Sequence, residues 1–198
     1  MLLPPPLVLP LPQGSGDLSA SLSATGDQLA VGRGQEVLVY DLSGPAPTER
    51  HLGQVAESSY TRPRFAPDGA LWAGLHRLDA AGAWTQLLHL PDDRFSPVGD
   101  LAFLPDRRIA RQALGPDGHV VALFAPQGDG YALQRLTEPK RLPHDAVLAV
   151  APDGTTLALS LDYVHVFDTS TGKAWKRLPG HKVYHGAFAC FCDEGLLF

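Results

Sequence analysis

The chain has 198 residues, of which 20 are Gly and 18 are Pro, and this content is typical of a folded domain rich in turns. Its formal charge of −5 argues against nucleic acid or an anionic membrane as a direct partner, because binding to either requires a basic face. The sequence contains no Asn, and Arg outnumbers Lys, a bias that indicates a GC-rich, bacterial source.

The chain begins with the apolar segment Met1–Pro12, which contains five prolines. It lacks the basic residues that open a signal peptide, and it is shorter than the roughly 20 residues of a membrane span. We therefore expect residues 1–16 to form a Pro-rich arm or an outer strand. The chain has only two cysteines, Cys190 and Cys192, and no signal sequence, so we expect a cytoplasmic protein.

A turn signal recurs along the rest of the chain. It occurs as SATGD (23–27), APDG (66–69), GPDG (115–118), APDG (151–154) and CDEG (192–195). The glycines of these turns follow one another at an average interval of about 42 residues, which lies within the period of about 40–45 typical of four-stranded propeller blades. The repeat therefore predicts an all-β chain built from such blades.

Strand signals occur in the same order around each turn. One run of strand-forming residues precedes the turn, at 18–24, 61–66, 110–114 and 146–151. A second run follows it, at 28–32, 70–75, 119–125 and 155–161, and a third comes later, at 36–41, 83–90, 131–136 and 164–168. Aromatic side chains on these strands, among them Trp72, Phe124 and Phe167, are expected to pack within or between blades.

This order places propeller blades over residues 17–198. Their expected bounds are 17–60, 61–108, 109–145 and 146–183, with a partial blade at 184–198. The longest interval between turns contains VGDLAFLPDRR (98–108), which we interpret as a long outer strand of the second blade. An alternative register treats LPDRR (104–108) as a degenerate turn of its own.

Three groups of residues resemble the bacterial WD-repeat (Trp-Asp repeat) propeller family. FAPDGALWA (65–73) and VAPDGTTLALS (150–160) are similar to the turn between the first two strands of a family blade. Tyr40-Asp41 and Phe167-Asp168 stand where the family has its Trp-Asp pair, and Gly180-His181 resembles the Gly-His that opens a blade. The resemblance implies a propeller fold, and it specifies function poorly because this fold hosts many activities.

The repeated residues are interpreted as structural. Asp27, Asp68, Asp117, Asp153 and Asp193 recur with the turns, as do Gly69, Gly118 and Gly154, so we expect turn capping rather than acid–base chemistry from the carboxylates. Four potential zinc ligands, His181, His185, Cys190 and Cys192, form the metal candidate of this sequence. Residues two apart on a strand lie about 6.6–7 Å from each other, too far for a compact zinc site, so we predict neither a metal nor a cofactor.

The period also bears on partners. About 4.7 blades are present, whereas the family commonly has seven. The chain is thus a fragment of a longer propeller, a ring completed by a second polypeptide or a further copy, or a small closed ring. We expect a non-catalytic interaction scaffold or sensor subunit of a bacterial multi-protein assembly, with the arm Met1–Pro12 and then Arg94–Arg108 as its contact candidates. The alternative is a propeller enzyme of the hydrolase or lactonase type with a metal site in the channel, although no known catalytic motif occurs.

Overall fold

The structure is a computed structural model that describes residues 9, 18–55, 62–137, 139, 147–160, 163–179, 190–192 and 195–197. Within these residues the secondary structure consists of β-strands and turns. None of the described segments forms a helix long and apolar enough to cross a membrane. The all-β prediction is confirmed.

Four antiparallel sheets of four strands each follow one another along the chain, and within each sheet every strand pairs with its neighbour in sequence. The first sheet contains β1 (Leu18–Leu22), β2 (Gln28–Arg33), β3 (Glu36–Asp41) and β4 (Thr48–Gln54). The second contains β5 (Arg64–Phe65), β6 (Leu71–Ala73), β7 (His76–Leu78) and β8 (Trp84–Gln86). The third contains β9 (Ser96–Phe103), β10 (Ile109–Gly115), β11 (Gly118–Gln127) and β12 (Gly130–Leu136). The fourth contains β13 (Val147–Val150), β14 (Thr156–Ser160), β15 (Tyr163–Asp168) and β16 (Ala174–Pro179).

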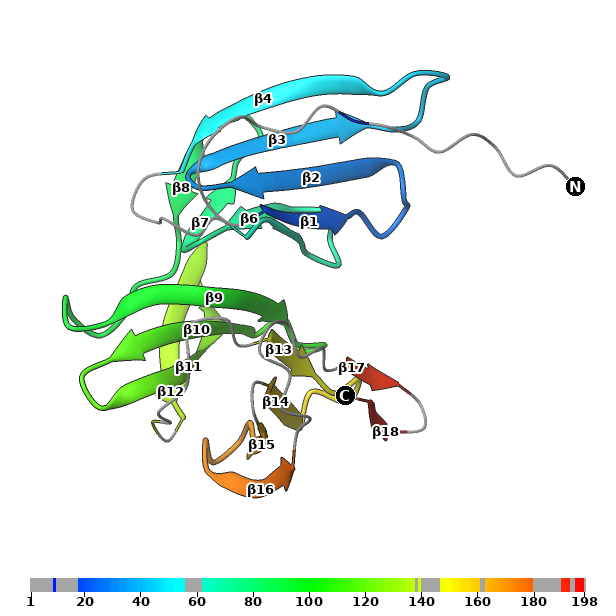
Figure 1. The fold of residues 1–198 in the computed structure, drawn as a ribbon. Helices are drawn as coiled ribbons and strands as arrows, with labels where there is room; N and C mark the ends of the chain where they lie inside the picture. The colour runs from blue at the N-terminus through cyan, green and yellow to red at the C-terminus, as the bar shows by residue number, and fades with distance from the viewer. Residues whose placement is uncertain are drawn as a thin grey trace, which may run out of the picture.

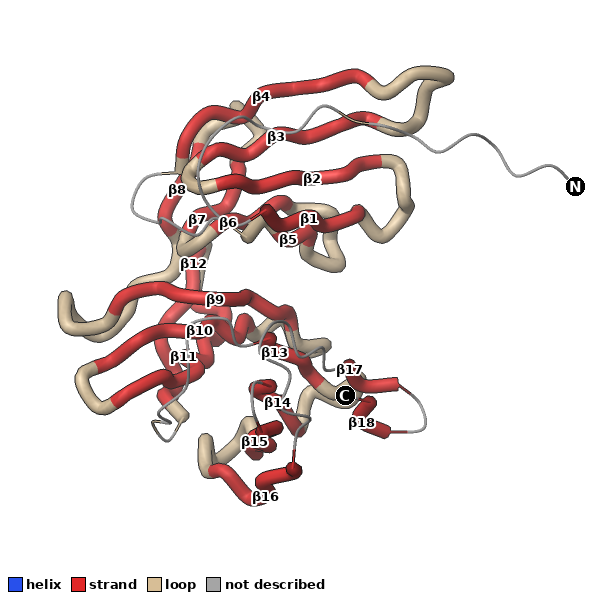
Figure 2. Tube along the Cα trace, in the orientation of Figure 1, coloured by secondary structure: helices blue, strands red, loops and turns tan. Residues whose placement is uncertain are grey.

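The sheets are arranged as the blades of a β-propeller, which confirms the predicted fold class (Figure 1). Their first strands meet from sheet to sheet, because β1 contacts β5 and β9 contacts β13. Beyond the fourth sheet, β17 (Cys190–Cys192) and β18 (Gly195–Leu197) form a two-stranded hairpin, and β17 contacts β13 (Figure 2). This hairpin lies where a partial fifth blade was predicted.

The core is divided among the gaps between successive sheets. Ala30, Val37 and Val39 of the first sheet form one cluster with Leu71 and Ala73 of the second. A second cluster joins the second and third sheets, and a third cluster joins the third and fourth. Middle strands such as β3 read as continuous apolar runs, Val37 to Tyr40, because both faces of each blade are packed.

The third sheet corrects one prediction. Residues 98–108 are not an outer strand of the second blade, because β9 is the first strand of the third sheet and pairs with β10. The turn before β10 is therefore 104–108, as in the alternative register, and GPDG (115–118) connects β10 to β11 instead. In consequence the third sheet begins at Ser96 rather than at residue 109, and 131–136 is its fourth strand rather than its third.

In the second sheet, too, the observed strands differ from the predicted ones. The strand expected at 83–90 is reduced to β8, the fourth strand of its sheet, and the third strand is the short β7, which the sequence did not indicate. A strand of three residues, His76–Leu78, carries too little pattern to be recognised.

Candidate interaction surfaces

The turns after the first strands share one backbone pattern. In three of them the amide of a glycine donates to the carbonyl three residues earlier: Gly26 to Ser23, Gly69 to Ala66 and Gly154 to Ala151. These glycines have φ values of +75°, +83° and +71°, in the left-handed region that glycine enters without steric cost. In the third sheet the same bond runs from Arg107 to Leu104, and Arg107 has a φ of 68°. An arginine therefore occupies the glycine position of the repeat.

The turn carboxylates bind backbone amides. Asp68 accepts a hydrogen bond from the amide of Ala70 at 3.0 Å, and Asp153 accepts one from the amide of Thr155 at 2.9 Å. The Thr155 amide and then its hydroxyl hold the pKa of Asp153 below its ordinary value. Asp117 lies instead in the turn between β10 and β11, where Gly118 has a φ of 129°. Asp193 lies outside the described residues.

In each of the two aromatic-Asp pairs, the aromatic residue lies in the core and the aspartate lies at the surface. Tyr40 and Phe167 are buried, with exposed fractions of 1% and 0%. Asp41 accepts hydrogen bonds from the amide and hydroxyl of Ser43, and Asp168 does so from the amide and hydroxyl of Ser170. In both cases the serine hydroxyl is the first cause that lowers the pKa of the carboxyl. These residues thus hold the turn between the third and fourth strands of their sheets.

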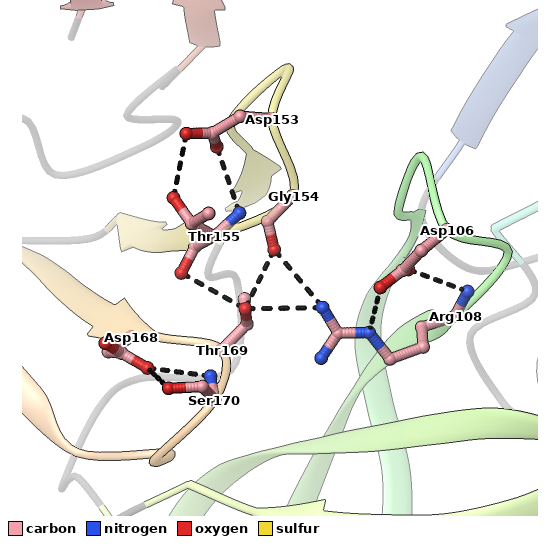
Figure 3. Close-up of polar contacts among 8 residues, drawn as sticks. All are labelled: Asp106, Arg108, Asp153, Gly154, Thr155, Asp168, Thr169 and Ser170. Atoms are coloured by element: carbon pink, nitrogen blue, oxygen red, sulfur yellow. Dashed lines mark hydrogen bonds and ion pairs between the residues drawn. The ribbon is translucent and has the colours of Figure 1, made fainter.

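A polar contact joins the third and fourth sheets (Figure 3). It lies at the end of the sheets that carries the turns between first and second strands and between third and fourth strands, which we call the turn end. Asp106 accepts a bond from Nε of Arg108 at 2.6 Å, and the Arg108 Nη2 lies 3.4 Å from both the Gly154 carbonyl and Thr169 Oγ1. Thr169, which is 3% exposed, donates its hydroxyl proton to the Gly154 carbonyl at 2.8 Å. The contact joins turns of consecutive sheets, so its polar residues have a structural role.

A buried charged network connects the second and third sheets. Arg64 on β5 binds both carboxylate oxygens of Asp100 on β9 at 2.9 Å. Arg111 on β10 is 1% exposed; its Nη1 donates to the Gly99 carbonyl, while its Nε and Nη2 have no hydrogen-bond partner in the described part of the chain. Burial lowers the pKa of Arg111 to about 10, so it stays protonated at neutral pH. Sequence reasoning missed these residues, whose only signal was charge inside apolar strands.

A groove of about 680 Å³ opens between the second and third sheets at the turn end. Trp72, Phe103 and Tyr131 line it with aromatic rings: Trp72 meets Phe103 at 6.2 Å between ring centroids and Tyr131 at 5.5 Å, both in edge-to-face geometry. Its rim comes from the turns at 66–68, 104–107 and 126–130, together with Arg77 on β7. We refer to it as the aromatic groove.

The first sheet presents an apolar face on the side away from the second sheet. Val31, Leu38 and Tyr40 form a cluster there with the partly buried Leu9 of the Pro-rich arm. On β1, Ala20 pairs with Val31 and Leu22 pairs with Leu29, so β1 contributes to the same face. Leu18 and Leu22 are 49% and 56% exposed, and they are the exposed large hydrophobic residues of the described chain. Val31, Leu38 and Tyr40 are at most 5% exposed, so we call only the part of this surface at Leu18 and Leu22 of β1 the open face.

The predicted metal candidate is described only in part. His181 and His185 lie outside the described residues, and Cys190 and Cys192 lie on β17, where only the backbone is described. Among the residues whose side chains are described, no group of three or more His, Cys, Asp or Glu side chains is arranged to hold a metal ion.

Comparison with known proteins places the chain by its fold. No model of a protein family and no curated protein matches it. Among solved structures, a chain of hydrazine synthase from Kuenenia stuttgartiensis matches 91% of this chain with a TM-score of 0.69 and 18% sequence identity. A chain in the mitotic checkpoint complex matches 83% with a TM-score of 0.64 and 16% identity. This chain spans 53% and 51% of the length of those two chains. The likeness shows a propeller fold, and membership of the WD-repeat family stays a prediction.

Proposed function

We propose that this protein is a non-catalytic β-propeller that acts as an interaction subunit, a scaffold or sensor, in a bacterial cytoplasmic multi-protein assembly. The observation that carries this proposal is the open face. In the gaps between sheets, the core residues are almost fully buried, whereas Leu18 and Leu22 leave about half of their surface exposed to water. Two large aliphatic side chains exposed on the same face of one strand favour burial against another protein surface.

The solved structures support the proposal at the level of fold. One of the two matched chains comes from the mitotic checkpoint complex. Propellers present their loops and faces on a rigid framework, which suits recognition by contact. The partner would be a second polypeptide or a further copy of this chain, and its contact would bury the leucines of β1.

The test replaces Leu18 and Leu22 together by Ser. We expect the unaltered chain to co-purify from its source organism in a complex of defined mass, measured by light scattering, and the double variant to lose that complex. Its melting temperature should fall by no more than about 2–4 °C, because both leucines are already half exposed. Ala20→Ser, on the same strand and face, is the matched control and should keep the complex.

Two outcomes would contradict the proposal. One is an unaltered chain that runs alone at monomer mass in extracts and after purification. The other is a complex that survives in the double variant, which would place the partner away from the open face.

A further inference from the structure

We propose that the aromatic groove is a binding site for a short peptide segment in which an aromatic side chain stands next to a carboxylate. This inference rests on the proposed function, since it names the kind of partner that a second surface of the same interaction protein would take. The groove's volume of about 680 Å³ lies within the range typical of ligand pockets.

The aromatic side chain follows from the groove's lining. Trp72 is only 2% exposed and makes edge-to-face contacts with the partly buried Phe103 and Tyr131, so a ligand ring would meet mainly those two side chains. Three prolines, Pro67, Pro105 and Pro126, stand in the turns around it. A further aromatic ring extends such a cluster with the same edge-to-face or offset geometry.

The carboxylate follows from two arginines at the rim. Arg77 on β7 is the cross-strand partner of Trp72, and Arg107 lies in the turn 104–107, which also lines the groove. Both are exposed, and neither takes part in the ion pairs of the described residues, which join Arg64, Arg94 and Arg108 to aspartates. Two aspartates also line the groove: Asp68 binds the amide of Ala70, and Asp129 is exposed in the turn before β12.

Arg107 is the residue at which the chain departs from its own repeat. Glycine stands at the equivalent position of the other three turns, at residues 26, 69 and 154. Arginine at a φ of 68° is strained, because its Cβ crowds the backbone in the left-handed region. Strain of this kind concentrates at functional sites, and here it coincides with the groove. The conformational strain of the Arg107 backbone thus coincides with a guanidinium group that lines the groove.

The same position supplies a sharp test. Arg107→Gly removes the guanidinium and relieves the backbone strain, so it should raise the melting temperature by about 2–4 °C while it weakens ligand binding. Loss of binding in this variant therefore cannot come from unfolding. Arg94→Gly removes an exposed arginine from outside the groove, one that pairs with Asp92, and it is the matched control.

The probes are three blocked hexapeptides, titrated by NMR. The first contains Phe followed by Glu between Gly-Ser and Ser-Gly ends; the second has Gln for Glu, and the third has Ala for Phe. We expect the Phe-Glu peptide to bind the unaltered chain about fivefold more tightly than the Phe-Gln peptide, as one exposed charge pair allows. In Arg107→Gly this ratio should fall to about two, the share left to Arg77, whereas in Arg94→Gly it should persist, and the Ala-Glu peptide should not bind measurably.

Three results would overturn the inference: no binding of the Phe-Glu peptide, a Glu-to-Gln ratio unchanged by Arg107→Gly, or shift changes that map away from Trp72 and Tyr131. The leucine variants of the open face report separately on the proposed function. If they abolish the complex while the peptides fail, the groove proposal falls and the interaction function stands.

Discussion

At the scale of single residues, exposed aspartates hold this fold's turns through short hydrogen bonds. Asp27, Asp41, Asp153 and Asp168 all have pKa values lowered by bonds from hydroxyls or amides within their own turns. A carboxyl with a lowered pKa in the folded state contributes stability that is present above its unfolded pKa and is lost as the pH falls through its folded pKa. Acid should therefore loosen the turns before it affects the apolar core.

Thermal unfolding between pH 5 and pH 2 tests this expectation. We expect the melting temperature to begin to fall near the ordinary carboxyl pKa of 3.8 and to continue falling below it. Asp168→Asn should show a smaller decrease over that interval, because its side chain does not titrate. Asp129→Asn, in a turn without such a bond, should follow the unaltered chain. A variant at Asp168 with the full acid response would contradict this account.

At the scale of elements, the contact in Figure 3 joins the third sheet to the fourth. Thr169 is the residue on which it depends, because its buried hydroxyl donates to the Gly154 carbonyl and lies 3.4 Å from the Arg108 guanidinium. Thr169→Val keeps the side-chain shape and removes the donor. We expect the free energy of unfolding to drop by about 1–3 kcal/mol, the cost of an unsatisfied buried polar group, measured by urea denaturation.

The control for this change is Thr48→Val, on the exposed strand β4, which should alter the free energy of unfolding by less than about 0.5 kcal/mol. Equal effects at both positions would show that the contact between sheets adds nothing specific to stability.

Elements also show what could be predicted from the sequence. The first and fourth sheets follow the predicted strand order because Gly26 and Gly154 mark their turns. The third sheet does not follow the predicted order, because Arg107 stands where the other turns have glycine. The predicted first turn was therefore placed at Gly118 instead. The aromatic groove and the Arg64–Asp100 pair were not predicted at all. They join residues of different sheets, and 36 positions separate the two partners of that pair, so no local pattern reports them.

At the scale of the whole molecule, three of the core clusters each belong to two sheets at once. Leu101 on β9 packs in the cluster that contains Trp72 and Leu88 from the second-sheet region and Phe124 from β11. Leu101→Ala should therefore lower the free energy of unfolding by about 2–5 kcal/mol and destabilise both sheets together. Tryptophan fluorescence and circular dichroism should report one coincident transition.

Leu133→Ala is the comparison. Leu133 is only partly buried against the same cluster, so its replacement should lower the free energy of unfolding by less than Leu101→Ala does. Two separate transitions in the Leu101 variant would show that the second and third sheets unfold independently, contrary to the shared core.

The shared gaps between sheets also bear on how such a chain can grow by gene duplication. Every interior sheet carries one face for the gap before it and another for the gap after it, as the clusters on either side of the third sheet illustrate. A duplicated sheet inherits both faces, so its insertion creates one new gap, in which the second face of the original sheet meets the first face of the copy. The unit of inheritance is thus one sheet, whereas the unit on which selection acts is the pair of faces that meet in a gap.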